Sequence, residues 1–365
     1  MAAALPISAQ GLSAQKAILM DGNTGRVLFE KNADSRSLIA STTKIMTALV
    51  VCEQCNVLDR MRIPNEAVGI EGSSIYLQEG EILTIQDLLY GMMLHSGNDA
   101  ATALAIYCGG TVEGFAQLMN DKAQDLGMYN THFTNPHGLD APDHYSTARD
   151  LAILAAEAMK NSIFVSTVSA KTTTAGNRRF TNHNKLLWRV EGANGVKTGY
   201  TKAAGRILVS GAKRDGRQLI AVTIDAPDDW KDHAAMLEDG FAGFSQRKLI
   251  SRGDRIGVVD VASGQDKKVA LVASSDFFWP MADGESVSII LPGNGFVYAP
   301  VYEGQFAGNA HILVDGECIG TIELEYGSTI EQFKEQRLSI WKRLIGGYYD
   351  RQNSEDTIFS RSNIP

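Results

Sequence analysis

The sequence predicts an α+β domain, in which one sheet is packed by helices, followed by a small all-β domain and an amphipathic C-terminal helix. Three observations support this prediction. Strand-like runs lie at both ends of the first 248 residues and enclose a helical middle. After about residue 249 the chain changes to short β-rich runs between glycine-containing turns, and its last part returns to helical spacing. With 365 residues, the chain is long enough for two domains.

The first predicted elements are a hairpin and a central helix. Residues 17–31 contain two β-runs around a turn at Gly22–Gly25, which is a hairpin pattern. A helix then begins near Ser41. Its apolar face is formed by Ile45, Met46, Leu49 and Val50. Because this face is wide, we expect the helix to be central in the core.

The middle of the domain is predicted to be helical. Residues 85–107 have a helical pattern, but Ser96-Gly97-Asn98-Asp99 interrupts it, since Gly and Asn disfavour helix interiors. We therefore expect a loop between two helices, with Asp99 as the cap of the second. Further helices are expected at 114–126 and 147–160.

The end of the domain returns to strands. Residues 206–212 and 218–225 flank Asp215-Gly216, a strong hairpin turn. Lys197-Thr198-Gly199 lies just before this hairpin and should occupy a strand at the sheet edge. A helix from about 229 to 244 closes the segment. Strands at both ends of the domain predict one sheet assembled from both.

The chain divides into four predicted segments. Residues 1–14 are disordered or the remnant of a signal peptide, because 1–10 lack the charged region and long apolar core of a complete one. Residues 15–248 form the α+β domain and 249–326 the β-rich domain. The β-runs of that second domain are 255–261, 268–272, 286–291 and 311–314. Residues 327–365 form the amphipathic helix and tail.

Apolar residues recur at helical spacing in the last segment. They are Ile330, Phe333, Leu338, Trp341, Leu344, Ile345 and Tyr348, and Lys334, Arg337, Lys342 and Arg343 lie mostly elsewhere on the helix. Such a basic amphipathic helix can lie in a membrane interface. It can equally pack on its own protein or on a partner subunit, and the pattern alone favours neither.

Charge and composition exclude several classes of function. The net charge of −8 and the lack of a basic block argue against nucleic acid as a partner. No uninterrupted apolar run approaches the ~18–20 residues that cross a bilayer.

Neither the cysteines nor the histidines predict a metal or cofactor site. Cys52 and Cys55 form a C-x-x-C within the predicted central helix, which favours buried helical thiols over a redox pair, and Cys108 and Cys318 stand far apart. Further along the chain, the spacings between the neighbouring histidines do not match a helical metal pair. These are His132, His137 and His144, of which His137 is expected to order a loop.

Three short motifs carry the chemistry. Ser41-Thr42-Thr43-Lys44 places a hydroxyl and an amine one helical turn apart on one helix face. A serine becomes a good nucleophile only when a nearby base removes its proton. Ser96-Gly97-Asn98 adds a hydroxyl and an amide, and Lys197-Thr198-Gly199 adds a cation on a strand edge. The order and separation of the three motifs match a known acyl-transfer signature.

Neighbouring segments extend the match. They include 31–34, 72–77, 87–91, 135–140 and 146–151. Together with the motifs, they resemble the low-molecular-mass penicillin-binding proteins of the D-alanyl-D-alanine carboxypeptidase type, closely over about 15–245 and more loosely beyond. The resemblance implies a β-lactamase/transpeptidase-like catalytic domain and no cofactor.

The resemblance also implies a role for each motif residue. Ser41 would attack the carbonyl between two D-alanines of a peptidoglycan stem peptide, and Lys44, kept neutral by burial and by Lys197, would be its base. Ser96 would relay protons to the leaving amine, and Asn98 would hold Lys44 and the substrate.

The strand motif would bind the substrate. Lys197, Thr198 and Gly199 would engage its carboxylate edge, and the backbone N–H groups of Ser41 and Tyr200 would form the oxyanion hole. β-Lactams would acylate Ser41, and the protein would be exported to the extracytoplasmic face of the cytoplasmic membrane. Some relatives carry carboxylate-binding arginines in segments that here read Asn182–Lys185 and Asp228–His233, without an arginine.

Two alternatives remain. A class A β-lactamase shares the three motifs, but it needs a glutamate that activates the deacylating water, and residues 135–150 contain none. A binding or scaffold protein on this fold, without activity, is the second alternative.

Overall fold

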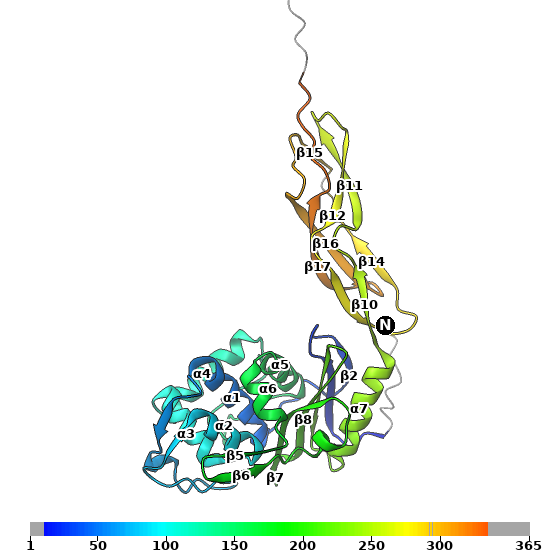
Figure 1. Cartoon of the computed structure of the whole chain (residues 1–365). Coiled ribbons are helices and arrows are strands. Elements are labelled where there is room, and N and C mark those ends of the chain that lie inside the picture. The colour runs from blue at the N-terminus through cyan, green and yellow to red at the C-terminus, as the bar shows by residue number, and fades with distance from the viewer. Residues whose placement is uncertain (1–10, 292, 294, 335–365) are drawn as a thin grey trace, which may run out of the picture. The chain divides into compact units, whose positions relative to one another are not determined.

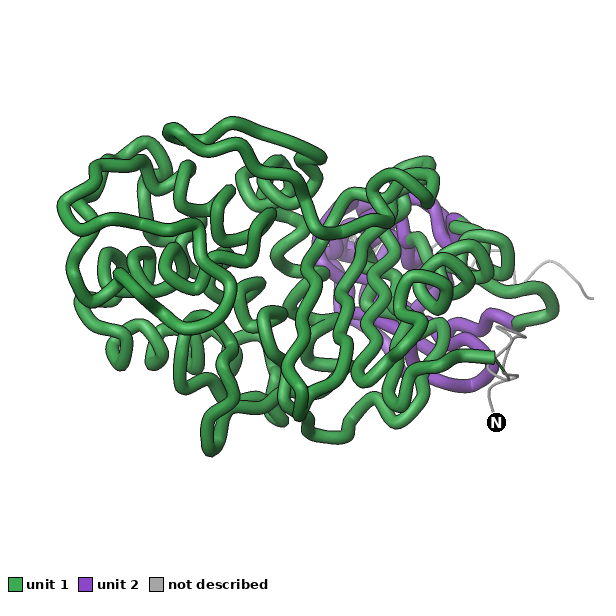
Figure 2. Tube along the Cα trace, turned by 90° about the horizontal axis from the view of Figure 1, so that it is seen from below, with its two compact units in different colours: residues 1–247, 278–285 green, residues 248–277, 286–365 purple. Residues whose placement is uncertain are grey.

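The computed structural model describes residues 11–291, 293 and 295–334 (Figure 1). These residues form two compact units (Figure 2). The first takes the chain up to residue 247 together with 278–285, and the second takes 248–277 and the chain from 286 onward. The sequence-based boundary lies at 248/249, and it does not anticipate that 278–285 belongs to the first unit.

The first unit contains an antiparallel five-stranded sheet in the order β2-β1-β9-β8-β7. The strands are β1 (Lys16–Asp21), β2 (Val27–Lys31), β7 (Ala193–Thr201), β8 (Gly205–Arg214) and β9 (Arg217–Ile224). Lys16 of β1 pairs with Ile224 of β9. The prediction of one sheet built from both ends of the domain is therefore confirmed.

Helices cover both faces of this sheet (Figure 1). They are α1 (Lys44–Gln54), α2 (Ile85–Leu94), α3 (Asn98–Gly109), α4 (Val112–Asp125), α5 (Ala148–Ala158), α6 (Ser162–Ser169) and α7 (Asp229–Gly243). Because strand side chains alternate between faces, Ile18 and Met20 join the core on the α1–α6 side, whereas Ala17 and Leu19 join the core under α7. Helix α1 is buried from Lys44 to Cys52, as its wide apolar face predicts, and only its last two residues are exposed.

Several short elements of this unit were not predicted. They are α6 and the strands β3 (Arg60–Arg62), β4 (Ile82–Thr84), β5 (Thr172–Ala175) and β6 (Arg178–Thr181), which pair as two small hairpins. These strands have three or four residues each, too few to show a period-2 apolar pattern.

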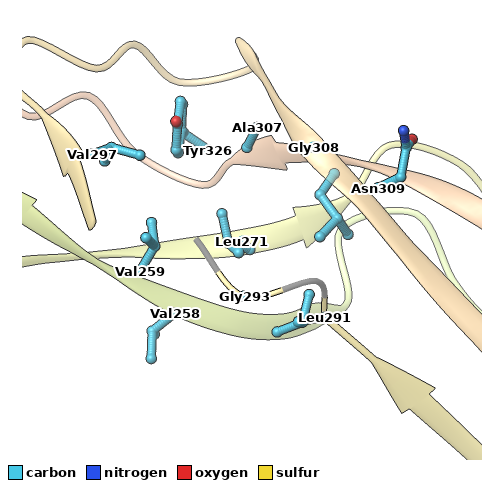
Figure 3. A pocket seen from close by; sticks show the side chains of 11 residues that line it. Val258, Val259, Leu271, Leu291, Gly293, Val297, Ala307, Gly308, Asn309 and Tyr326 are labelled. Carbon is cyan, nitrogen blue, oxygen red and sulfur yellow. The ribbon is translucent and has the colours of Figure 1, made fainter. Parts of the chain in front are cut away.

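The second unit is all-β, as predicted. Its six-stranded sheet has the order β14-β16-β17-β12-β11-β15. Strands β10 and β13 pair in a separate ladder and cross the boundary along the chain, since residues 245–247 and 278–281 belong to the first unit. The strands are β10 (Ser245–Ile250), β11 (Arg255–Ala262), β12 (Lys268–Ala273), β13 (Phe277–Met281), β14 (Val287–Ile290), β15 (Phe296–Tyr298), β16 (Phe306–Val314) and β17 (Glu317–Tyr326). Within this unit, Val259, Leu271 and Val297 are among the residues that line a pocket of about 230 Å³ (Figure 3).

The predicted C-terminal helix begins differently from the expectation. Ile330 forms a β-bridge with Val301, is buried in the core of the second unit, and is followed by a second bridge between Gln332 and Gly264. Residues 327–334 therefore extend the β-rich unit and are not helical. The rest of the predicted helix, 335–365, lies outside the described residues.

Among the helices that the model describes, none is by itself long and apolar enough to cross a membrane. Of the helix pairs within the described ranges, α5 and α6 together reach that length and composition, and they are bent by 108° relative to each other.

Candidate active site

Ser41 lies in a 3-10 turn, Ala40–Thr43, that leads directly into α1. The helix proper starts at Lys44, three residues later than the sequence predicts. Ala40 has a φ of 45°, a left-handed conformation that a residue with a Cβ rarely adopts and that commonly marks a functional site. The turn keeps Lys44 Nζ 2.9 Å from Ser41 Oγ, so the predicted pairing of hydroxyl and amine is present.

The amine of Lys44 is fully enclosed and has three oxygen neighbours. Besides Ser41 Oγ, these are Asn98 Oδ1 at 2.7 Å and the His137 carbonyl oxygen at 2.6 Å. Burial, and then the charge of Lys197, hold the pKa of Lys44 well below its usual range, against an opposing effect of Asp99.

The three oxygen neighbours of Lys44 leave its nitrogen lone pair available to act as a base. The oxygens of Asn98 and His137 can only accept hydrogen bonds, so they take the two N–H donors of a neutral amine. The nitrogen lone pair is then left for the O–H of Ser41. The geometry therefore allows Lys44 to withdraw the Ser41 proton.

The Ser96-Gly97-Asn98 motif connects α2 to α3, as predicted. Ser96 has a φ of 66° and is nearly buried, and among the described residues its hydroxyl has no hydrogen-bond partner. Asn98, the first residue of α3, donates from Nδ2 to the Glu71 carbonyl oxygen at 2.6 Å. That bond fixes the amide so that its oxygen faces Lys44.

Asp99 does not cap α3 as predicted. Its carboxylate instead accepts hydrogen bonds from the backbone N–H groups of Ile75 and Leu77 and from the hydroxyl of Ser74. The buried carboxylate thereby fixes the loop that follows Ser73, a residue of the cleft described below.

The Lys197-Thr198-Gly199 motif lies on β7, at the edge of the sheet as predicted. Lys197 is buried, which lowers its pKa to about 7, and its Nζ donates to the Thr198 carbonyl oxygen at 3.0 Å. A Cβ on Gly199 would lie 3.3 Å from the Ser41 backbone nitrogen. The glycine thus lets the strand pass close to the nucleophile turn.

A cleft of about 380 Å³ joins these motifs. It is lined by Ser41, Ser73, Ser96, His183, Lys185, Thr198, Gly199, Tyr200, Arg206, Asp229 and Trp230. Five of the predicted site residues therefore face one space. Lys44, Asn98 and Lys197 are buried, and Lys44 and Asn98 reach the cleft through their bonds to Ser41 and to each other.

Arg206 on β8 is a cleft residue that the sequence analysis missed. Its Nη2 donates to both carboxylate oxygens of Asp229 at 2.8 Å, and its guanidinium lies 5.9 Å from the Trp230 ring. Nε and Nη1 have no partner among the described residues. Strand register could have revealed it, because Arg206 pairs across the β7–β8 hairpin with Tyr200.

Two of the histidines, His137 and His144, help to order the loop behind Lys44. Burial, and then the charge of Lys44, lower the pKa of His137 to about 3, and its Nδ1 accepts from the Leu139 N–H at 3.2 Å. His144 Nε2 lies 2.8 Å from Thr43 Oγ1. Next to His137, Gly138 has a φ of 89°, and a Cβ there would lie 1.8 Å from the Ala40 carbonyl oxygen. His137 therefore orders this loop, as expected.

Two family models match the chain. One, described as D-alanyl-D-alanine carboxypeptidase, matches residues 3–228, and the other, described as the C-terminal domain of penicillin-binding protein 5, matches residues 244–332. The chain is 33% identical over 351 residues to D-alanyl-D-alanine carboxypeptidase DacF of Bacillus subtilis, an alignment that covers 92% of this chain and 90% of that protein. It is 31% identical over 333 residues to DacA of Escherichia coli, covering 84% and 81%.

Solved structures show the same similarity. Penicillin binding protein 5 from Haemophilus influenzae aligns with a TM-score of 0.75 at 32% identity, covering 88% of this chain and 98% of that one. The DD-transpeptidase of Streptomyces K15 aligns with a TM-score of 0.62 at 36% identity, covering 64% of this chain and 99% of that one. The second similarity therefore spans about the part of the chain that holds the cleft.

Proposed function

The chain belongs to the D-alanyl-D-alanine carboxypeptidase family, and we propose that it removes the terminal D-alanine from peptidoglycan stem peptides through an acyl-enzyme on Ser41. One observation carries the assignment of the nucleophile. The buried amine of Lys44 lies 2.9 Å from Ser41 Oγ, and burial favours its neutral form. An unprotonated amine at this distance is the base that serine needs.

Acylation starts when Lys44 takes the Ser41 proton and Oγ attacks the carbonyl carbon between the two D-alanines. The carbonyl oxygen gains negative charge, which the backbone N–H groups of Ser41 and Tyr200 stabilise from the cleft wall. Ser96, whose hydroxyl has no hydrogen-bond partner among the described residues, passes the proton to the departing amine. The C–N bond breaks and D-alanine leaves with a neutral amine.

Arg206 and Thr198 hold the terminal carboxylate of the substrate. Arg206 has donors at Nε and Nη1 that have no partner among the described residues, and either can give the carboxylate a charge-assisted hydrogen bond. Asp229 keeps the guanidinium in position through Nη2 alone. Arg206 on β8 thus supplies the arginine that the segments 182–185 and 228–233 do not contain.

Water then hydrolyses the ester on Ser41 and restores the enzyme. A β-lactam acylates the same oxygen. Because its amide is cyclic, the amine that is released stays tethered to the acyl group, remains in the cleft and blocks the approach of water. The class A β-lactamase alternative is not favoured, because residues 135–150 provide no glutamate and the His137 carbonyl oxygen occupies the space beside Lys44.

The test is release of D-alanine from diacetyl-lysyl-D-Ala-D-Ala together with labelling by a fluorescent penicillin. We expect the protein to do both, the labelled peptide to contain Ser41, and Ser41→Ala to lose both activities by ~10³-fold or more. Ser35→Ala, an exposed serine six residues earlier, is the control and keeps both. Rapid penicillin turnover without stable label would support a β-lactamase. If the protein showed neither D-alanine release nor penicillin labelling, it would be a binding protein without activity.

For the cell, we propose that the protein is exported and works at the extracytoplasmic face of the cytoplasmic membrane, with residues 335–365 as its membrane contact. Peptidoglycan stem peptides lie outside that membrane, and the tail carries Trp341, Leu344 and Ile345 at helical spacing with Lys342 and Arg343 beside them. Ile330 belongs to the β-rich core, so the membrane segment is confined to the residues after it.

Truncation tests the anchor. A chain ending at residue 334 should no longer sediment with vesicles that contain anionic lipid, while its release of D-alanine from a soluble peptide stays unchanged. Equal sedimentation of the full and truncated chains would contradict the anchor and leave the catalytic proposal intact.

A further inference from the structure

Two cysteines from distant parts of the sequence meet in the first unit. Cys55 follows the last residue of α1, and Cys108 lies in the last turn of α3. Their sulfur atoms are 2.9 Å apart, both are free thiols, and both side chains are partly exposed. The sequence analysis predicted buried helical thiols at Cys52 and Cys55 and did not pair either of them with Cys108, which lies 53 residues from Cys55. Packing of α1 against α3 brings the two together (Figure 1).

We propose that Cys55 and Cys108 are a disulfide-forming pair that joins the C-terminal ends of α1 and α3. Cys52, the other member of the C-x-x-C, is buried within α1. The pair is open to a small reagent from solvent, which a buried cysteine is not.

The cross-link forms by thiol–disulfide exchange with a low-molecular-mass disulfide such as oxidised glutathione. The Cys55 thiolate attacks one sulfur of the reagent, forms a mixed disulfide and releases one glutathione thiolate. Cys108 then attacks the Cys55 sulfur, forms the intramolecular bond and releases the second. The two cysteines lose two electrons to the reagent, and their two protons go to the departing thiolates.

Surroundings make Cys55 the first nucleophile. Its contact with Cys108 lowers the pKa of Cys55 and raises that of Cys108. Burial raises the pKa of Cys52 to about 12, which keeps that thiol protonated and inert. The thiolate, which is the reactive form, therefore forms preferentially at the position that faces Cys108.

The bond has a consequence for the cleft because α1 and α3 also carry catalytic groups. Lys44 begins α1 and Asn98 begins α3, and their side chains meet at 2.7 Å. A disulfide at the far ends of the same two helices fixes them relative to each other at both ends. It also closes a chain loop that contains Ser96, which restricts the unfolded state.

Oxidation of the full-length protein tests the pair. Reduced protein is incubated with oxidised glutathione, alkylated, digested without reduction and mapped by mass spectrometry. We expect a peptide that joins Cys55 to Cys108, a loss of about 2 Da from the intact chain by the balance above, and a melting temperature raised by roughly 5–15 °C. Reduction should reverse all three.

Matched variants decide between the possible partners. Cys108→Ser and Cys55→Ser should each abolish the joined peptide and the thermal shift, while Cys318→Ser, at an exposed cysteine of the second unit, should leave both unchanged. A Cys52–Cys55 peptide, a stable glutathione adduct, or dimers through Cys318 would each overturn the proposal. These readouts do not depend on the proposed catalytic function.

Discussion

At the scale of single residues, the cleft depends on charges that burial and neighbours have shifted. Lys44 and Lys197 are both enclosed, and burial is the largest cause of the lowered pKa of each. The motifs predicted which residues meet, because their spacing reflects helix and strand geometry. The motifs themselves do not include Arg206, which the pairing of β8 with β7 brings opposite Tyr200 and which binds Asp229, 23 residues away.

Replacing Arg206 with Met should weaken substrate binding without affecting acylation chemistry. We expect KM to rise by ~10–100-fold with little change in kcat, because a charge-assisted hydrogen bond to the substrate carboxylate is lost. Arg206→Lys should recover only part of the loss. Steady-state kinetics with the free-acid peptide and with its carboxamide measure the effect.

Arg214→Met is the matched control for that change. Arg214 lies on the same strand and also pairs with an α7 carboxylate, that of Glu238, but it does not line the cleft. Equal KM changes in the two variants, or an unchanged preference for the free acid in Arg206→Met, would remove Arg206 from the carboxylate site.

Buried histidines should make stability fall in mild acid. Burial lowers the pKa of His233 to about 3 and is also the main reason why those of His137 and His144 lie near 3 and 4. Since the unfolded chain binds these protons near pH 6.5, it gains protons first as the pH falls. Each histidine should cost about 1 kcal/mol per pH unit between pH 6.5 and its folded pKa.

Thermal unfolding between pH 7.5 and 5 measures this effect. His233→Asn should be less stable at pH 7.5, because it loses contacts to Ser210 and Thr223, but its melting temperature should depend less on pH. His311→Gln, at an exposed site, should keep the full dependence. An unchanged slope in the His233 variant would contradict the assignment.

At the scale of elements, the cleft is held by close approaches between a turn, a loop and a strand edge. Gly138 fits against the Ala40 carbonyl, and Gly199 fits against the Ser41 backbone. The long helices and strands were predictable from their apolar periodicity. The left-handed residues Ala40 and Ser96 were not, because their conformations are imposed by packing and oppose the local preference.

Gly138→Ala should displace the nucleophile turn. Its Cβ would fall 1.8 Å from the Ala40 carbonyl oxygen, so backbone must shift. We expect penicillin labelling to slow by at least ~10²-fold and the free energy of unfolding to fall by ~2–3 kcal/mol. Gly216→Ala has a similar φ of 81° with nothing within 4 Å, and it isolates the cost of the left-handed backbone. Equal effects in both variants would rule out the close contact as the cause.

At the scale of the whole molecule, the chain returns to its first unit after entering the second. Residues 278–285 belong to the first unit, where Glu285 pairs with Arg26 and Ala282 joins the core under α7. The sequence predicted a single crossing at 248/249. It could not show the return, because 278–285 read locally as a strand and a turn, and Arg26, the partner of Glu285, lies 259 residues earlier.

A catalytic domain cut at residue 247 should therefore be less stable than the full chain. Removal of Glu285 leaves the largely buried guanidinium of Arg26 without its carboxylate, which should cost ~2 kcal/mol or more. Glu285→Gln in the full chain should reproduce much of this loss in urea denaturation, whereas Asp283→Asn, at a fully exposed carboxylate, should not. A cut domain as stable as the full chain would contradict the role of the return.

The order of strands in the sheet also determines when the sheet can form during synthesis of the chain. The pairing of Lys16 with Ile224 joins a segment made at the start of synthesis to one made far later. Until β9 has left the ribosome, β1 and β2 have no central neighbour, and the turn with Ser41 has no β7 beside it. The nucleophile is thus synthesised early, but the sheet beside it cannot be completed until the chain has been made as far as β9.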